Sequence, residues 1–213
     1  MPQSGEMVYV VDDDISIREA MTDLLVALKL PVKSFESAES FLRHERVDAA
    51  ACLILDLELP EMNGLELQTH LAHTPDIPVI FMTGHGDIPS SVRAMKGGAL
   101  EFLTKPVDHK VLAAAVRMAL DLNRQARSRQ ADMARLRDRV SSLTPREREV
   151  LPLLVMGYLN KQVAAALGIS EVTVQIHRGR IMRKMAAPSF ADLVRMCDLI
   201  GIPDDANPRL SRA

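Results

Sequence analysis

Acidic side chains, one hydroxyl and one lysine follow four apolar segments in the first half of the chain. Three aspartates (Asp12, Asp13, Asp14) follow residues 7–11, Asp56 ends residues 52–56, Thr83 follows residues 78–82 and Lys105 comes soon after residues 100–103. Carboxylates brought together raise one another's pKa values unless a cation neutralises them. Oxygen ligands favour a hard ion, and Mg²⁺ suits an open pocket because it keeps several waters. The residue types indicate a carboxylate that attacks phosphorus, with the metal, the ammonium and the hydroxyl stabilising the transferring group.

Each of these features is ordinary when taken alone. Asp14 is predicted to be a helix N-cap, Thr83 could cap the turn into Gly84, and Lys105 before Pro106 could be an exposed loop lysine. The hypothesis of one pocket depends on their recurrence at the ends of successive strands. Because the carboxyl ends of parallel strands lie along one edge of a sheet, residues far apart in sequence can converge there.

The elements that must position these residues alternate between strands and helices. Strands are expected at residues 7–11, 31–35, 52–56, 78–82 and 100–103, and helices at residues 15–29, 38–46, 65–73 and 88–96, with a long helix from Asp108. Apolar positions 15, 20, 24, 25 and 28 define the expected buried face of the first helix, and Ser37 is the expected N-cap of the second. Five βα units predict an α/β fold, a doubly wound, flavodoxin-like parallel sheet in the order 2-1-3-4-5.

The helix from Asp108 is expected to continue beyond this fold as a linker. Apolar spacing runs through positions 122, 126, 133, 136, 140 and 143, with Arg129 interrupting it, and residues 124–139 are otherwise very polar. A solvent-exposed connecting helix is the favoured interpretation. Pairing with a second copy as a coiled coil stays open, because the seam is short and contains a charge.

The charges divide unevenly between the two halves of the chain. Residues 1–123 carry 10 Lys and Arg against 19 Asp and Glu, whereas residues 124–213 carry 16 against 9. The second half is therefore the candidate for binding a polyanion. Chance segregation of solvated charges is the alternative.

Four segments resemble the signature segments of response-regulator receiver domains, especially the FixJ-type subgroup. They are VVDDD (10–14), LDLELPEMNG (55–64), FMTGHGDIP (81–89) and EFLTKP (101–106). The resemblance implies that Asp56 is the phosphoacceptor and that Mg²⁺ is bound by Asp13 directly, Asp12 through water, Asp56, and the Glu58 carbonyl. It further implies that Lys105 holds the phosphoryl group, that Thr83 moves toward it and that Phe102 turns inward. The Lys105–Pro106 bond would be cis.

The second half contains a helix-turn-helix pattern. Helices are expected at residues 145–156, 160–167, 171–185 and 189–200. The helices at 160–167 and 171–185 are joined through Gly168, and in such a motif the second helix enters the major groove of DNA. Val174, Ile181 and Met185 form its apolar face. The residues predicted to contact DNA are Thr173, Gln175, Ile176, Arg178, Gly179, Arg180, Arg183 and Lys184. The basic ones would neutralise phosphates, Gln175 would bond adenine, and Ile176 would touch a thymine methyl. A small helical bundle that binds protein is the alternative.

This half resembles the four-helix LuxR/NarL-type DNA-binding domain. The resemblance lies in LTPREREVL (143–151), NKQVAAALGIS (160–170), TVQIHRGRIMRKM (173–185) and the helix from Ser189. It implies a structural role for Glu147 and base-facing positions for Gln175, Ile176 and Gly179. Because glycine offers no side-chain contact, base readout is expected to depend on Gln175, Thr173 and Arg180.

The two resemblances together predict a two-component response regulator of the FixJ/NarL type that is not an enzyme. The expected parts are a receiver at residues 7–122, a linker helix at 123–142, a DNA-binding domain at 143–203 and a tail at 204–213. A sensor histidine kinase would phosphorylate Asp56, the phosphorylated chain would form a homodimer on double-stranded promoter DNA, and transcriptional activation would follow. RNA polymerase is a further candidate partner.

Two other functions are weighed against this prediction. A Mg²⁺-dependent phosphatase with an aspartyl nucleophile usually has a second Asp two residues later, where this chain has Glu58. A receiver whose basic domain engages RNA or polymerase is the other alternative. Apolar runs are far shorter than the roughly 20 residues that span a bilayer, and the two cysteines lack disulfide or metal spacing, so a cytoplasmic protein without membrane partners is expected.

Overall fold

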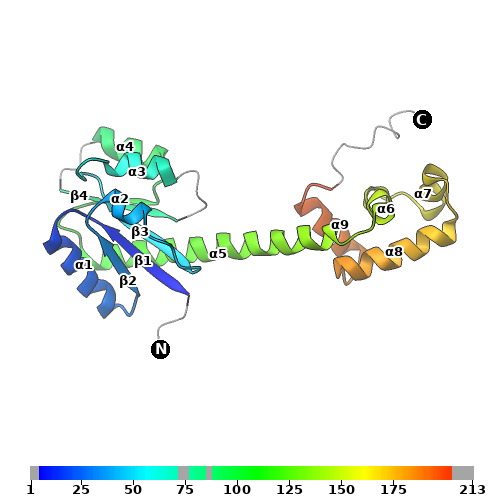
Figure 1. The fold of residues 1–213 in the computed structure, drawn as a ribbon, viewed down its shortest axis with the longest axis horizontal. Helices are drawn as coiled ribbons and strands as arrows, with labels where there is room; N and C mark the ends of the chain where they lie inside the picture. Colours follow the sequence, from blue (N-terminus) through cyan, green and yellow to red (C-terminus); the bar gives the residue numbers. More distant parts are fainter. Residues whose placement is uncertain (1–4, 72–76, 85–87, 203–213) are drawn as a thin grey trace. The chain divides into compact units, whose positions relative to one another are not determined.

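A computed structural model of the chain describes residues 5–71, 77–84 and 88–202. The chain divides into two compact units, residues 1–128 and 129–213 (Figure 1). The division falls within one long helix, α5 (His109–Ser141). It also falls within the predicted linker, residues 123–142.

The first unit is built on a five-stranded parallel sheet in the order β2-β1-β3-β4-β5, which confirms the predicted topology. The strands are β1 (Glu6–Val11), β2 (Val32–Phe35), β3 (Ala50–Asp56), β4 (Val79–Thr83) and β5 (Glu101–Thr104). The parallel register pairs Val11 of β1 with Leu55 of β3, and Leu55 with Phe81 of β4. These pairings bring the carboxyl ends of the central strands to one edge of the sheet.

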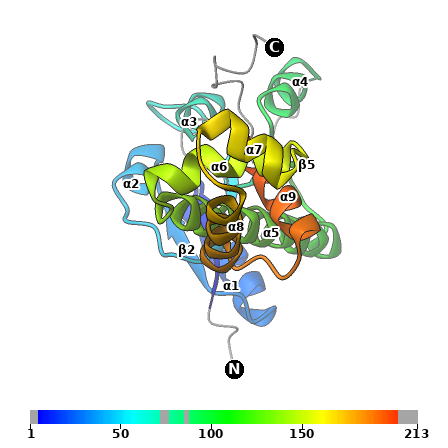
Figure 2. The same cartoon turned by 90° about the vertical axis from the view of Figure 1, so that its right-hand side faces the viewer.

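Helices cover both faces of this sheet (Figures 1 and 2). In addition to α5 they are α1 (Ile15–Ala27), α2 (Ala38–Leu42), α3 (Gly64–Leu71) and α4 (Ile88–Lys96). One face packs strand residues such as Leu53 against α2, α3 and α4, and the other packs neighbours such as Ile54 against α1 and α5. Every residue of β3 and β4 is buried, which explains why both strands read as continuous apolar runs.

The first helix differs from its predicted length and buried face. It ends at Ala27, and Lys29 beyond it has a left-handed φ of 62°. Ile15 and Ala20 were expected on the buried face, but Ile15 is 60% exposed and Ala20 is also exposed. Ile17 and Met21 pack against the core instead. Met21 and Ile17 lie four and eight positions before the fully buried Leu25, so the three residues share one face of the helix. The buried face is therefore rotated relative to the predicted one.

The second helix is shorter than the predicted 38–46. It has the expected Ser37 N-cap, with reciprocal hydrogen bonds between Ser37 and Ser40, but it ends at Leu42. The Val47 N–H donates to the Tyr9 hydroxyl at 3.3 Å, which holds the chain that follows Leu42 on its way back to β3. The third helix is described as far as Leu71, and the predicted positions 72 and 73 lie outside the described residues.

In its described part, up to residue 202, the second unit consists of the end of α5 and four further helices. They are α6 (Pro145–Val155), α7 (Asn160–Leu167), α8 (Glu171–Met185) and α9 (Phe190–Leu199). Thr144 caps α6, and Pro145 lies in its first turn. Apolar residues of α6 to α9, such as Val150 and Val163, form one core with Leu143 from the α5–α6 connection, and Val140 of α5 packs against it.

The linker helix and the residues just after it contribute side chains to each unit. In the first unit, Asn123 Oδ1 accepts a hydrogen bond from the Ala51 N–H at 2.8 Å. In the second unit, Leu136 and Leu143 at the end of the predicted seam are buried, whereas Leu122 is 45% exposed. Pairing of this seam with a second copy stays an open alternative. Within the described ranges, no helix has both the length and the apolarity to cross a membrane.

Candidate functional site

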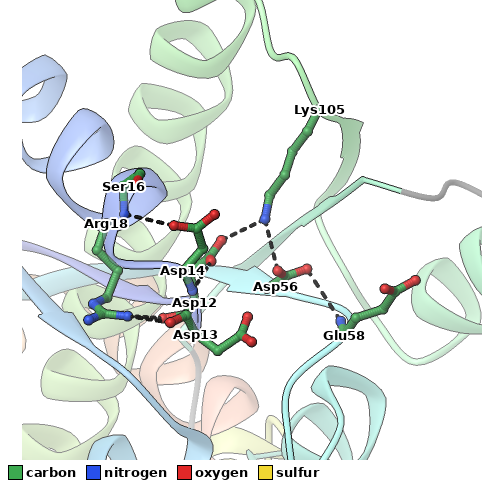
Figure 3. A network of polar contacts seen from close by, with 8 residues as sticks. All are labelled: Asp12, Asp13, Asp14, Ser16, Arg18, Asp56, Glu58 and Lys105. Carbon is green, nitrogen blue, oxygen red and sulfur yellow. Dashed lines mark hydrogen bonds and ion pairs between the residues drawn. The ribbon is translucent and has the colours of Figure 1, made fainter.

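The ends of β1, β3 and β5 bring three charged side chains together (Figure 3). Lys105 Nζ lies 2.7 Å from Asp12 Oδ2 and 2.8 Å from Asp56 Oδ2. The Lys105 backbone is itself placed by its N–H, which donates to the Thr83 carbonyl of β4 at 2.8 Å. The sheet therefore unites residues that are 49 and 93 positions apart in sequence.

Three carboxylates form a cluster beside this lysine. Asp12, Asp13 and Asp56 each offer one oxygen, and these oxygens lie within 4.8 Å of one another. Asp12 and Asp56 are buried, whereas Asp13 faces solvent. An all-oxygen donor set with one open side fits a hard divalent cation that retains water ligands. Asp14 stands apart, because its Oδ1 accepts from the Ser16 N–H and caps α1 as predicted.

Burial and pairing set the protonation of this pocket. Burial raises the pKa of Asp12, and although the Lys105 ammonium and the Asp14 N–H lower it, the pKa stays above the ordinary 3.8. Burial lowers the pKa of Lys105, but hydrogen bonds to Asp12 and Asp56 more than offset this effect and leave the pKa above the ordinary 10.5. Lys105 therefore carries its positive charge at neutral pH.

The start of α3 approaches the Asp56 backbone so closely that its first residue must be a glycine. A Cβ on Gly64 would lie 2.4 Å from the Asp56 carbonyl oxygen and 2.9 Å from the Phe81 ring. The Glu58 N–H donates to Asp56 Oδ1 at 3.3 Å, so the loop after β3 contacts the carboxylate. The sequence Asn63-Gly64 marks a turn before a helix, but no pattern in it reveals this close approach.

The residues implied to act as a switch lie on β4 and β5. Thr83 is fully buried at the end of β4, and Phe102 is half-buried with its ring centroid 6.3 Å from that of Phe81. The Lys105–Pro106 bond is cis, which confirms that expectation. Residues 85–87, which come soon after Thr83, lie outside the described residues.

Arg18 contacts the acidic loop, although its sequence position gives little sign of this. Its Nη1 donates to the carbonyl oxygens of Asp12 at 2.8 Å and Asp13 at 2.9 Å (Figure 3). The available signal is weak: Arg18 is four residues after the N-cap, and helical side chains point back toward the N-terminus of their helix.

In the second unit, α7 and α8 form the predicted helix-turn-helix. Gly168 ends α7 in a left-handed conformation with φ of 64°, and Ser170 caps α8 by accepting from the Thr173 N–H at 3.1 Å. The predicted apolar face of α8 (Val174, Ile181, Met185) is fully buried. Five of the predicted DNA-contacting positions are exposed on α8: Gln175, Ile176, Gly179, Arg180 and Arg183.

The structure gives two of the predicted phosphate-binding residues partners inside the domain. Lys184 forms an ion pair with Glu147 at 2.8 Å and donates to the Ser142 carbonyl at 3.0 Å. The Arg178 guanidinium lies over the Phe190 ring, 4.5 Å from its centroid. Both side chains are therefore held against the scaffold rather than projecting from the helix as Arg180 and Arg183 do.

Glu147 joins the start of α6 to the end of α8. Its carboxylate is buried, accepts from the Thr144 N–H at 2.9 Å and pairs with Lys184. Burial raises the pKa of Glu147, but hydrogen bonds from the Lys184 ammonium and the Thr144 N–H lower it by more, so the pKa lies below the ordinary 4.5. The structural role that the resemblance implied for Glu147 agrees with these contacts.

Comparison with known proteins identifies both parts of the chain. Residues 8–117 match the response regulator receiver domain family, and residues 141–197 match the bacterial regulatory proteins of the luxR family. The nodulation protein W of Bradyrhizobium diazoefficiens is 48% identical over 92% of this chain and 87% of its own length. The transcriptional regulatory protein FixJ of Azorhizobium caulinodans is 41% identical over 98% of this chain and all of its own.

Solved structures give the same result. The response regulator StyR superposes with a TM-score of 0.84 at 45% identity, covering 92% of this chain and 99% of that one. Full-length FixJ from B. japonicum has a TM-score of 0.55 at 35% identity, covering 93% and 98%. The chain therefore belongs to the DNA-binding two-component response regulators of the FixJ/NarL type, in which a receiver domain precedes a LuxR-type helix-turn-helix domain.

Proposed function

We propose that Asp56 accepts a phosphoryl group from a sensor histidine kinase and that this reaction controls binding to promoter DNA. The observation that carries the proposal is the Lys105 ammonium within 2.8 Å of both Asp12 and Asp56. A carboxylate beside a fixed positive charge and further carboxylates has the environment of a nucleophile that must receive an anionic group. Asp56 is also the carboxylate at the end of the central strand of the sheet.

The donor set fits Mg²⁺. Asp13 would bind it directly, Asp12 through water, and Asp56 and the Glu58 carbonyl would complete the protein contacts. When bound, the ion supplies positive charge that offsets the phosphoryl oxygens and orients them for in-line transfer. The buried Asp12 and the exposed Asp13 support this assignment, since one side of the cluster stays open to water and to the phosphodonor.

The residues around Asp56 then have separate tasks. Lys105 holds one phosphoryl oxygen, and the Thr83 hydroxyl moves to bond another. Phe102 lies half-buried next to Phe81, and its inward rotation couples the pocket to the face formed by α4 and β5. Phosphorylation adds charge and acceptor oxygens at Asp56, and this addition shifts the Thr83–Phe102 switch from one of its two states to the other.

The output is binding to double-stranded promoter DNA as a homodimer, since one small module rarely binds tightly alone. The exposed Gln175, Ile176 and Arg180 of α8 support base readout, and Arg183 supports phosphate contact. We assign the receiver to residues 7–122, the linker to 123–142 and the DNA-binding domain to 143–203. Transcriptional activation, with RNA polymerase as a further partner, completes the proposal.

Replacement of Asp56 by asparagine tests the proposal. The variant should take up no label from a radiolabelled small-molecule phosphodonor in the presence of Mg²⁺, because the amide is not a nucleophile toward phosphorus. Asp14→Asn is the matched control: it removes a charge from the same pocket edge while keeping an N-cap residue, and it should be labelled like the wild type. Labelling of Asp56→Asn at the wild-type level would place the acceptor elsewhere.

A further inference from the structure

One arginine fixes the backbone of the acidic loop from outside the carboxylate cluster. Arg18 lies in the first turns of α1, and its Nη1 donates to two consecutive carbonyl oxygens, those of Asp12 and Asp13 (Figure 3). The two distances are 2.8 and 2.9 Å. A single donor shared by neighbouring carbonyls restrains the rotation of the peptide unit between them.

This restraint acts on the residues that direct carboxylates toward Asp56. The Asp12 side chain is held from several sides, since Oδ1 accepts from the Asp14 N–H and Oδ2 from Lys105. The Asp13 side chain is exposed, and its backbone carbonyl is held by Arg18. The direction of the Asp13 carboxylate therefore depends on a peptide unit whose position Arg18 sets.

The charge of Arg18 and its hydrogen bonds have opposite effects on a cation in the pocket. Among the described residues, no carboxylate forms an ion pair with its guanidinium, so its charge acts directly on the acidic loop. A fixed positive charge there repels a divalent cation. Fixing the ligands in place favours the cation, because a site that is already formed loses less conformational freedom on binding.

We propose that Arg18 is a positioning residue for the metal site, which holds the Asp12–Asp13 backbone so that both carboxylates face Asp56 and thereby raises the affinity for Mg²⁺. The proposal rests on the magnesium site of the proposed function. Groups that orient metal ligands typically change metal affinity by about 10–100-fold when removed. The gain in Mg²⁺ affinity from fixing the Asp12–Asp13 backbone therefore outweighs the repulsion between the Arg18 charge and the cation, and removal of the guanidinium weakens Mg²⁺ binding.

Two substitutions at position 18 separate the two effects. Arg18→Met removes both charge and donors while an unbranched side chain keeps the packing, and Arg18→Lys keeps the charge and one donor group. Thr22→Val is the control for simple damage to α1, because it removes the hydrogen bond from Thr22 Oγ1 to the Arg18 carbonyl without touching the guanidinium. Mg²⁺ affinity is measured on the full chain by isothermal titration calorimetry at constant ionic strength, after circular dichroism has checked each fold.

We expect about a tenfold weaker Mg²⁺ affinity for Arg18→Met, a smaller loss for Arg18→Lys and no change for Thr22→Val. The Mg²⁺ concentration needed for half-maximal phosphorylation should rise in parallel, while the rate at saturating Mg²⁺ is largely retained. Equal or tighter binding by Arg18→Met, or an equal loss in Thr22→Val, would overturn the proposal. If Arg18→Met does not fold, an unchanged affinity in Arg18→Lys together with an unchanged Mg²⁺ requirement would overturn it.

This experiment also separates the inference from the function on which it rests. Failure of the wild-type chain to bind Mg²⁺, or binding that Asp13→Asn leaves intact, would contradict the magnesium site itself. Wild-type binding that Asp13→Asn abolishes and Arg18→Met leaves unchanged would contradict the role of Arg18 alone.

Discussion

Replacing Lys184 with methionine should destabilise the second unit, because Lys184 neutralises a buried carboxylate. The Glu147 side chain is 2% exposed and lies 2.8 Å from Lys184 Nζ, which is 34% exposed. Removing one partner of a fully buried pair costs about 3–5 kcal/mol. The partial exposure of Lys184 and the remaining hydrogen bond from the Thr144 N–H reduce the expected loss of unfolding free energy to about 2 kcal/mol.

A loss of this size is easily measured by scanning calorimetry on the full chain. For a unit of 60–100 residues, each kcal/mol shifts the midpoint by about 4–8 °C, so the second unit should melt about 8–16 °C earlier. Hydrogen exchange of peptides from α6 and α8 assigns the transition, since these helices carry the two partners. In a double-mutant cycle, Glu147→Gln combined with Lys184→Met should cost less than the sum of the single changes.

The pH dependence of the Lys184→Met effect has a definite sign. The pKa of Glu147 is depressed in the folded chain, so its contribution to stability is fully present above the unfolded value near 4.5 and is lost as pH falls through the lower, folded value. The difference in midpoint between wild type and Lys184→Met should therefore be constant near neutrality and shrink below pH 4.5.

Arg183→Met is the matched control for Lys184, because Arg183 is exposed on the same turn of α8. It should weaken binding to duplex DNA in a salt-dependent manner while leaving the midpoint nearly unchanged. If Lys184→Met weakened DNA binding at a wild-type midpoint, Lys184 would be a phosphate contact and the structural reasoning would be refuted.

Two further predictions concern the start of α3 and the exposed face of α8. Gly64→Ala should lower the free energy of unfolding by about 1–3 kcal/mol through overpacking and slow the labelling of Asp56. The reason is that the new Cβ would meet the Asp56 carbonyl oxygen, which belongs to the backbone and not to a movable side chain. Wild-type values in calorimetry and in label uptake would mean that the backbone shifts to make room for the methyl group. Gln175→Ala combined with Arg180→Ala should abolish enrichment of a specific duplex in a DNA selection while the chain stays folded, and persistent enrichment of one sequence would place base readout on other residues.

The sheet was predictable because its central strands, β3 and β4, are buried on both faces. A parallel strand covered by helices needs apolar residues at every position, so β3 reads as one continuous run that ends in Asp56. Once the strands are known, their parallel arrangement places Asp12, Asp56 and Lys105 along one edge without further information. The pocket was therefore accessible from the order of the strands alone.

Helix orientation was less predictable, because apolar residues occur on exposed faces too. Ile15 is apolar but 60% exposed, so hydrophobicity alone misplaced the buried face of α1. On α8 the spacing of the apolar residues was enough to predict the position of one charged residue, Arg178. Arg178 is four positions after Val174 and three before Ile181, which places it beside the buried face and next to Phe190.

Side chains that bind backbone groups had almost no signature in the sequence. Arg18 donates to two carbonyls, and Asn123 accepts from the Ala51 N–H. Every residue offers a carbonyl and nearly every residue an N–H, so the partner's residue type gives no clue to such a contact. Only the fold determines which backbone groups come within reach. The residues that stabilise the loop and the linker were for this reason the ones that sequence patterns missed.

The same kind of contact divides α8 into two functional halves. Its C-terminal end is held at the junction of α5 and α6, where Arg139 donates to the Met185 carbonyl at 3.0 Å and Lys184 pairs with Glu147. Its N-terminal half exposes Gln175 and Ile176. Recognition helices of this class read bases mainly through their N-terminal residues. If Gln175 and Ile176 read bases as proposed, fixing the far end of the helix to the scaffold would set the angle at which these two residues meet DNA, while their exposed side chains would choose the sequence.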